Sequence, residues 1–185
     1  SIPADNLLGD LNNGWNMATA MLMYERVAIG SGAVSGVRHE RADQLIEHAQ
    51  KLGKIEDPVV RDRLMKLYIM ETTASLVSMR TRAELKAGKT PGPGGSLGKL
   101  IGTNNMNFAR DLSLELIGPG SVAWDGESGG GWARGALTGL QGGIAGGTNE
   151  IQRNIIGDRV LGLPRDIDVS KNVPFSELKV GTQRD

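Results

Sequence analysis

Most of the chain follows a helical pattern, in which apolar side chains recur every three or four residues. The clearest case begins after residue 57, where one face carries Val60, Leu64, Leu67, Met70, Ala74 and Val77. Asp57 caps helices well and Pro58 suits the first helical position, so together they mark where this helix begins. The spacing predicts a long amphipathic helix that reaches about residue 87.

Further segments predict three more helices and the loops between them. One is expected to start at a Ser96 cap and to end at the glycine turn of residues 118–120, burying Leu97, Leu100, Ile101, Phe108, Leu112 and Leu116. At most a short helix is expected over residues 132–140, and Thr148 or Asn149 is expected to cap the last one. Glycine-rich stretches at 88–95 and within 121–147 predict loops. No strand pattern competes, so the expected fold is all-α, an up-down four-helix bundle.

The segment of residues 15–33 is apolar on nearly every side and carries only two charged residues, the adjacent Glu25 and Arg26. It predicts a helix that is capped by Asn12 or Asn13, runs to about residue 51 and is buried nearly all round. Glu25 shares one stripe of this helix with Trp15, Ala18, Leu22, Ile29 and Ala33.

A carboxylate on such a stripe is desolvated, which raises its pKa toward the range of a general base. The residues alone leave two interpretations of Glu25 open, a catalytic base or half of a structural ion pair. Arg26 either holds an anionic ligand or pairs with an acid.

Composition narrows the possible functions of the 185 residues. Lys and Arg together number 21, as do Asp and Glu, so no net basic charge favours nucleic acid. The absence of cysteine excludes disulfides and thiolate chemistry and fits a cytoplasmic protein. Two histidines are too few for most imidazole metal sites, so no metal is expected, and no apolar run is long enough to span a membrane.

The domain organisation follows from where the helical pattern starts and stops. The first residue is not Met, and residues 1–13 are expected to lead in from a preceding domain. Residues 14–165 are expected to form the helical bundle domain, and residues 166–185 a C-terminal tail with little periodicity.

Several stretches carry motifs that occur together in one family. Residues 145–165, AGGTNEIQRNIIGDRVLGLPR, combine a Gly-Thr pair with Ile-Gln-Arg and an apolar helix. Residues 2–15, IPADNLLGDLNNGW, lead into a helix that contains YERVAIG, and residues 96–120 form a helix that ends in a glycine turn. Together they resemble the C-terminal helical domain of acyl-CoA dehydrogenases over nearly the whole chain.

The resemblance implies an FAD-dependent enzyme that removes the α-proton of an acyl-CoA while a β-hydride passes to flavin N5, leaving a trans-2-enoyl-CoA. Most members carry the glutamate base immediately before the Gly-Thr pair, where this chain has Gly146. In the isovaleryl- and long-chain-type branches the base instead precedes an arginine on the first bundle helix, as Glu25 precedes Arg26. The resemblance therefore favours Glu25 as the base, with the backbone N–H of Gly146 bonding the thioester carbonyl.

The same resemblance implies substrate contacts for three residues. Arg26 corresponds to an arginine near the CoA moiety, with pairing to Glu25 as the alternative. Tyr24 and Met21 are candidates for the acyl pocket, although packing in the core explains each of them as well.

Flavin contacts are implied for residues of two motifs. Thr148 corresponds to a residue beside the flavin, although a helix cap explains it equally, and Gly147 belongs to the same motif. Gly118 and Gly120 belong to the glycine turn. The resemblance also implies an arginine for the FAD diphosphate of a neighbouring subunit, and in the matching stretch, residues 49–53, only Lys51 offers a charge.

Glu115 is a second departure from the family pattern. It stands where a glutamine is expected ahead of the glycine turn, and an acid near a pyrophosphate is unfavourable. Some family members pair two unlike chains that each supply part of the site, so a non-catalytic or flavin-poor partner subunit is the alternative function. A stand-alone helical interaction module is a third.

The partners that the resemblance implies are an acyl-CoA substrate and an electron-transfer flavoprotein as acceptor, with oxygen as the acceptor in the related oxidases. Assembly is expected as a homo-oligomer, a dimer or tetramer, or as a hetero-oligomer with a related chain. Fatty acyl and steroid side-chain thioesters both remain open as substrates.

Overall fold

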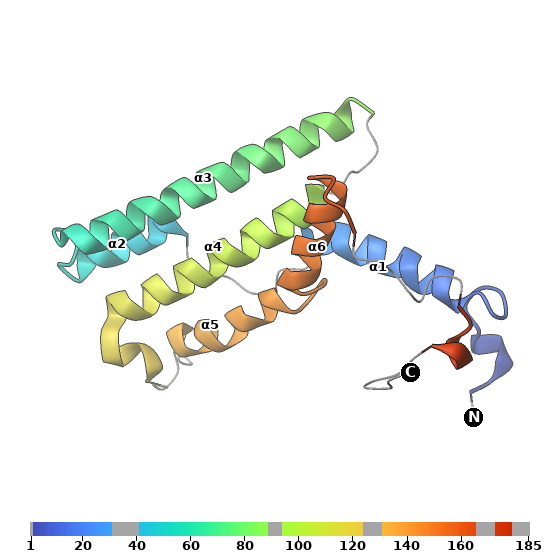
Figure 1. Ribbon diagram of the computed structural model, residues 1–185. Helices are drawn as coiled ribbons and strands as arrows, with labels where there is room; N and C mark the ends of the chain where they lie inside the picture. The colour runs from blue at the N-terminus through green and yellow to red at the C-terminus, as the bar shows by residue number, and fades with distance from the viewer. Residues whose placement is uncertain (1, 31–40, 89–93, 124–130, 166–172, 179–185) are drawn as a thin grey trace.

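The computed structural model describes residues 2–30, 41–88, 94–123, 131–165 and 173–178, and these contain helices and no strand (Figure 1). The all-α fold class is therefore confirmed. The described α-helices are α1 (Gly14–Gly30), α2 (Ala42–Lys51), α3 (Pro58–Lys86), α4 (Gly94–Ile117), α5 (Gly131–Gly139) and α6 (Asn149–Arg159). Shorter 3-10 turns include η2 (Gly118–Val122), which follows α4, and η4 (Leu140–Gly143), which follows α5.

Helix α4 is the centre of the fold, since α1, α2, α3, α5 and α6 all contact it. Figure 1 shows α3 along one side of α4 and α5 along the other, with α6 close to the N-terminal end of α4. The core lies where α2, α3 and α4 meet and consists of Ala42, Leu45, Ala49, Leu64, Leu67, Ala109, Leu112 and Leu116. Each buried leucine of this kind contributes about 1.5–3 kcal/mol.

Helix α3 begins and ends almost where its sequence pattern predicts. The Asp57 side chain accepts a hydrogen bond from the N–H of Val59 at 2.8 Å, and Pro58 is the first residue of the helix. Leu64 and Leu67 from the predicted face are buried. The capping prediction for α3 is confirmed.

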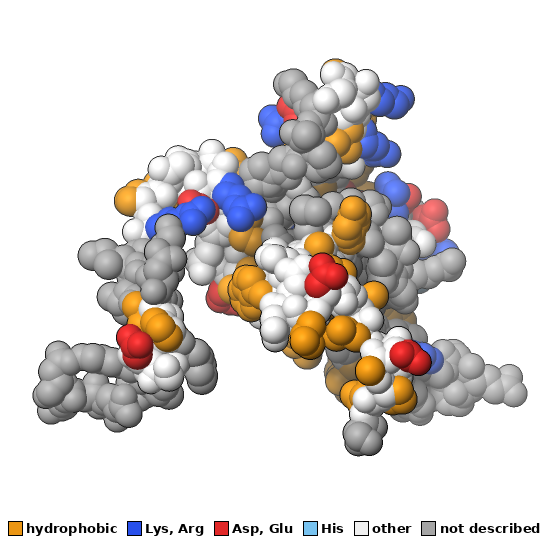
Figure 2. Space-filling model, turned by 90° about the vertical axis from the view of Figure 1, so that its right-hand side faces the viewer, with side chains coloured by type: hydrophobic (Ala, Val, Ile, Leu, Met, Phe, Trp, Pro, Cys, Tyr) orange, Lys and Arg blue, Asp and Glu red, His pale blue; other side chains and the backbone are white. Residues whose placement is uncertain are grey.

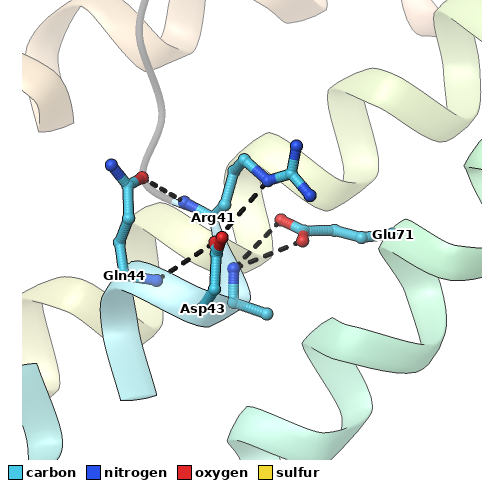
Figure 3. A network of polar contacts seen from close by, with 5 residues as sticks. Arg41, Asp43, Gln44 and Glu71 are labelled. Atoms are coloured by element: carbon cyan, nitrogen blue, oxygen red, sulfur yellow. Dashed lines mark hydrogen bonds and ion pairs between the residues drawn. The ribbon is translucent and has the colours of Figure 1, made fainter. Parts of the chain in front are cut away.

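The prediction of one continuous helix to residue 51 is wrong, because Arg41 is extended (φ −87°, ψ 163°) and α2 starts after it. A long-range contact fixes this start (Figure 3). The N–H of Ala42 donates to both carboxylate oxygens of Glu71 on α3, at 3.3 and 3.2 Å, and the N–H of Arg41 donates to Gln44 at 2.9 Å. A carboxylate at the positive end of a helix is stabilising, so Glu71 ties α2 to α3.

Helix α4 differs from its prediction at its start and along its buried side. It begins at Gly94, so Ser96 is not its cap but a buried residue inside the helix. The contacts on several sides of α4 bury polar side chains as well as leucines, among them Lys99, Thr103, Asn105 and Ser113. The predicted glycine stop is confirmed, because Gly118 is left-handed (φ 74°) directly after Ile117.

Helix α1 is not buried all round, which contradicts the prediction from its apolar composition. It projects away from the other helices (Figure 1), and Trp15 is 85% exposed and Tyr24 71% exposed. Figure 2 views the molecule from the side on which α1 projects and shows hydrophobic side chains gathered on that surface. The apolar pattern of α1 therefore marks a surface that other helices of the described chain leave uncovered.

Candidate functional site

The connection from η4 to α6 forms a turn without side chains at its centre. Gly146 (φ 68°) and Gly147 (φ 89°) are both left-handed, a conformation that costs other residues energy. Gly146 is buried and Gly147 is exposed. The predicted motif thus has a defined backbone shape, and we call residues 146 and 147 the glycine pair.

Thr148 caps α6, as one of the two interpretations of this residue predicts. Its backbone is extended (φ −61°, ψ 161°), and its Oγ1 accepts a hydrogen bond from the N–H of Ile151 at 3.3 Å. The capping interpretation is confirmed, and the flavin contact of Thr148 stays a prediction.

The glycine pair is held from the inside by Gln152, a residue of α6 that was not among the predicted site residues. Its side chain is fully buried, and its Nε2 donates to the carbonyl oxygen of Gly146 at 2.9 Å and of Gly147 at 3.5 Å. Its Oε1 is buried without a hydrogen-bond partner among the described residues. The signal in the sequence was an uncharged amide four residues after a capping threonine, inside the Ile-Gln-Arg motif.

Lys99 of α4 is a second buried polar residue beside this motif, and it too was missed. Only 7% of it is exposed, and its Nζ donates to Oδ1 of Asn149 at 3.4 Å. Burial lowers the pKa of Lys99, and the charge of nearby Glu150 opposes this shift. The pKa of Glu150 is lowered, first by its own backbone N–H and then by Thr148. Lys99 stands three residues from Ser96 and four from Thr103, the spacing of a buried helical face.

Thr103 completes the attachment of α4 to this connection. Its Oγ1 donates to the carbonyl oxygen of Gly142 at 3.0 Å. A Cβ at Gly142 would overlap with Cε of Met106, so the backbone approaches α4 closely here. Residues 142–149 are therefore attached to α4 through partly buried polar contacts on both sides of the glycine pair.

The predicted residues on α1 lie on the surface of the described chain. Glu25, Tyr24 and Met21 are all exposed, and the side chain of Arg26 lies outside the described residues. The predicted burial of Glu25 is wrong for this chain, as is core packing for Tyr24 and Met21. Because α1 and α6 both contact α4, one helix supports both motifs, and Figure 1 shows the C-terminal part of α1 reaching α4 near α6.

The other predicted flavin residues lie toward the opposite end of α4. Gly118 and Gly120 belong to η2, and Lys51 is the exposed last residue of α2. Lys54, just beyond α2, donates from Nζ to the carbonyl oxygen of Leu116 at 2.6 Å, which holds these two segments together. Lys99 and Leu116 are about 26 Å apart along α4 at 1.5 Å per residue. The structure therefore separates the predicted cofactor residues into two groups.

Glu115, the acid near the second group, is paired with Arg63 of α3. The guanidinium of Arg63 also lies 5.5 Å from the ring centre of Phe108. This pairing offsets the negative charge that was predicted to be unfavourable near a pyrophosphate.

The described ranges contain neither a grouped set of metal ligands nor a membrane-spanning helix. Within them, no three His, Cys, Asp or Glu side chains are grouped as a metal site requires. None of their helices combines the length and hydropathy needed to cross a bilayer.

The structure thus shows an all-helical domain in which a glycine pair directly precedes a capped helix. The family model described as the C-terminal domain of acyl-CoA dehydrogenase matches residues 12–161. The chain therefore belongs to the acyl-CoA dehydrogenase family.

Curated relatives agree with this assignment. The acyl-CoA dehydrogenase IpdE1 of Mycobacterium tuberculosis is 35% identical over 168 residues, covering 88% of this chain and 42% of the relative. The acyl-CoA dehydrogenase FadE26 of the same organism is 30% identical, covering 89% of this chain and 44% of the relative. The chain thus spans less than half the length of these relatives.

Solved structures share the fold. One, described as the Tcur3481-Tcur3483 steroid ACAD, aligns with a TM-score of 0.70 at 22% identity, covering 89% of this chain and 44% of that one. Another, the ChsE4-ChsE5 complex from Mycobacterium tuberculosis, aligns with a TM-score of 0.63 at 24% identity, covering 89% and 45%.

Proposed function

We propose that this chain is the C-terminal domain of an FAD-dependent acyl-CoA dehydrogenase in which Glu25 is the base. The observation that carries the proposal is the glycine pair. Gly146 is buried, left-handed and without a side chain at the position where most family members carry their glutamate. A base must then come from elsewhere, and α1 offers Glu25 before Arg26 on a helix that contacts α4.

The residues at the glycine pair fit a flavin. Gly147 is exposed and has no Cβ, so a flat ring can approach the backbone closely, and Thr148 starts a helix whose N-terminal end favours electronegative atoms. Bound FAD would supply the acceptor for the β-hydride.

In the proposed reaction the carboxylate of Glu25 takes the α-proton of the acyl-CoA thioester. The N–H of Gly146 donates to the thioester oxygen, which gains negative charge as the proton leaves. The electrons of the α-carbon form the new double bond as hydride departs from the β-carbon, giving the trans-2-enoyl thioester. Glu25 thus accepts the α-proton, and Gly146 stabilises the negative charge that forms on the thioester oxygen.

The exposure of Glu25 in this chain bears on how it becomes a base. A carboxylate needs removal from water to work near neutral pH, and we propose that the bound acyl chain and flavin provide it. Tyr24 and Met21, exposed on the same helix, are proposed to contact the acyl chain. Arg26 is proposed to contact the CoA moiety.

The second group of predicted cofactor residues is proposed to serve a different flavin. Gly118, Gly120 and Lys51 lie toward the end of α4 that is opposite the glycine pair, and this separation suits the flavin of a neighbouring subunit. Assembly as a dimer or tetramer, or with a related chain, follows from this proposal. The names of the structural neighbours, a steroid ACAD and a ChsE4-ChsE5 complex, favour pairing of unlike chains and a steroid-type thioester over a fatty acyl-CoA.

A flavin-poor partner subunit is the second candidate function, and the diphosphate contact favours it. Lys51 offers one ammonium where the resemblance implies an arginine, whose planar fork binds phosphate with two hydrogen bonds. In this case the paired chain would hold most of the flavin, and the domain described here would support assembly.

The absorbance spectrum of the intact protein tests both candidates, first alone and then with its paired chain. We expect a yellow protein whose flavin absorbance falls under anaerobic titration with an acyl-CoA, with steroid side-chain and fatty acyl thioesters compared. A protein that is colourless alone and yellow only with a partner would favour the second candidate. A flavin that no thioester reduces would contradict the first. We propose that the enzyme is cytoplasmic and that an electron-transfer flavoprotein accepts its electrons. Adding this flavoprotein should then reoxidise the reduced enzyme.

A further inference from the structure

Gln152 has features of a residue selected for position and not for stability. Its side chain is fully buried, yet Oε1 has no partner among the described residues. An apolar side chain of the same length would fill this space without burying an unsatisfied oxygen, which is unfavourable. What Gln152 adds is the Nε2 group, which donates to the carbonyl of Gly146 at 2.9 Å.

This hydrogen bond fixes the direction of the backbone in the glycine pair. The peptide unit is planar and trans, so the C=O of Gly146 and the N–H of Gly147 point in opposite directions. With the carbonyl of Gly146 turned toward buried Gln152, the N–H of Gly147 is turned toward the outside. Glycines have wide conformational freedom, so without this bond the two residues could rotate.

The space around Gln152 also restricts the glycine pair. A Cβ at Gly147 would lie 2.9 Å from Nε2 of Gln152. The amide therefore packs directly against the backbone that it binds. Beyond the pair, Thr148 caps α6 and Lys99 donates to Asn149, so the start of α6 is held as well.

We propose that Gln152 is a positioning residue: its side-chain amide holds the carbonyl of Gly146, which turns the N–H of Gly147 outward and keeps the glycine pair in the conformation from which the N–H of Gly146 meets the thioester oxygen. This inference rests on the proposed function, because it names what aligns the donors for the developing enolate. Gln152 itself touches neither substrate nor flavin.

The test uses the intact flavin-loaded protein with its paired chain and a 3-ketoacyl-CoA. This ligand ionises to a stable enolate and cannot undergo the dehydrogenation, so its binding reports on the donors without catalysis. The apparent pKa of the bound ligand is measured from the long-wavelength absorbance that an enolate gives beside oxidised flavin. Gln152→Met keeps the length and removes the donor, and Gln152→Glu replaces the amide nitrogen with an oxygen. Gln141→Glu, at an exposed residue of η4, is the matched control.

We expect both Gln152 variants to raise the apparent pKa of the bound ligand by about one unit or more and to weaken enolate binding roughly 10- to 100-fold, as misplaced donors do. Gln141→Glu should leave both values unchanged. If the ligand bound to Gln152→Met has the same apparent pKa as the ligand bound to the wild type, the inference is overturned and Gln152 is a packing residue, whatever the thermal stability of the variant. If the unmodified protein itself binds no enolate beside its flavin, the proposed function fails instead, so the two failures are distinguishable. Should Gln152→Glu not fold, Gln152→Met alone decides.

Discussion

Replacing Gly147 with alanine should destabilise the protein by more than a strained backbone alone explains. Gly147 has φ 89°, and forcing an alanine into this region costs about 1–2 kcal/mol. The new Cβ would also lie 2.9 Å from Nε2 of Gln152, whose side chain is fully buried. Displacing that amide breaks its bond to Gly146 and leaves buried groups unsatisfied, at about 1–3 kcal/mol. The sum is about 2–5 kcal/mol.

Gly53 provides the matched control for this substitution. It has φ 66°, and a Cβ there would meet no atom within 4 Å, so Gly53→Ala tests the strain alone. The two variants should differ by the contact with Gln152, about 1–3 kcal/mol. For a domain of this size each kcal/mol shifts Tm by about 2–4 °C.

The assay is thermal unfolding of the intact protein, followed by circular dichroism, for each variant alone and in a Gln152→Ala background. With the amide gone, Gly147→Ala should cost no more than Gly53→Ala, because the contact between the two residues no longer exists. Equal shifts in Tm for the two glycine variants in the wild-type background would refute the reasoning. So would a difference that persists without Gln152.

Three further predictions concern the frame around the site. Leu67→Ala should destabilise the protein by about 2–5 kcal/mol because Leu67 is fully buried, whereas Leu76→Ala on the same helix, where the side chain is 60% exposed, should cost far less. Urea unfolding compares the two variants, and equal midpoints would contradict the placement of the core. Lys99→Met should raise Tm at pH 7, because burial lowers the pKa of Lys99 below 10.5 and folding therefore disfavours its charged form. Since the unfolded chain binds more protons than the folded one, the wild type gains stability as pH rises toward 10.5, and the advantage of the variant shrinks. A Tm difference independent of pH would argue against this. Arg165 donates to both oxygens of Asp158, at 2.7 and 2.6 Å, and lowers the pKa of Asp158. The stabilisation from this ion pair is present above about pH 4 and is lost as pH falls through the lowered pKa. Arg165→Ala should therefore make the protein less stable above about pH 4 and leave its stability at lower pH unchanged, which acid unfolding curves would measure.

Local signals in the sequence predicted the helices well where a cap and a stop enclose an amphipathic face. Asp57 with Pro58, Thr148 and Gly118 all act as their residue types suggest. Long-range contacts were invisible to this reasoning. The contact of Glu71 with the start of α2 joins residues that are 29 positions apart, and no local pattern predicts it.

The prediction that α1 is buried nearly all round was the larger error, and it has a physical cause. An apolar helix predicts that something covers it, but not what covers it. In the described chain only part of α1 meets α4, so Glu25 is exposed despite its apolar neighbours. The candidate site was predicted as motifs, and the buried groups that hold one of those motifs, Gln152 and Lys99, emerged only from the structure.

The central claim is that the Glu25 carboxylate on α1 removes the α-proton, because the glycine pair carries no carboxylate at the position where most family members have one. The most direct measurement is rapid anaerobic mixing of the intact, flavin-loaded Glu25→Gln variant with an acyl-CoA that reduces the wild type. The amide has the size of the carboxylate but cannot accept the proton, so the account predicts that flavin reduction is lost while flavin content and Tm stay at their wild-type values. Flavin reduction by Glu25→Gln at the wild-type rate would contradict it.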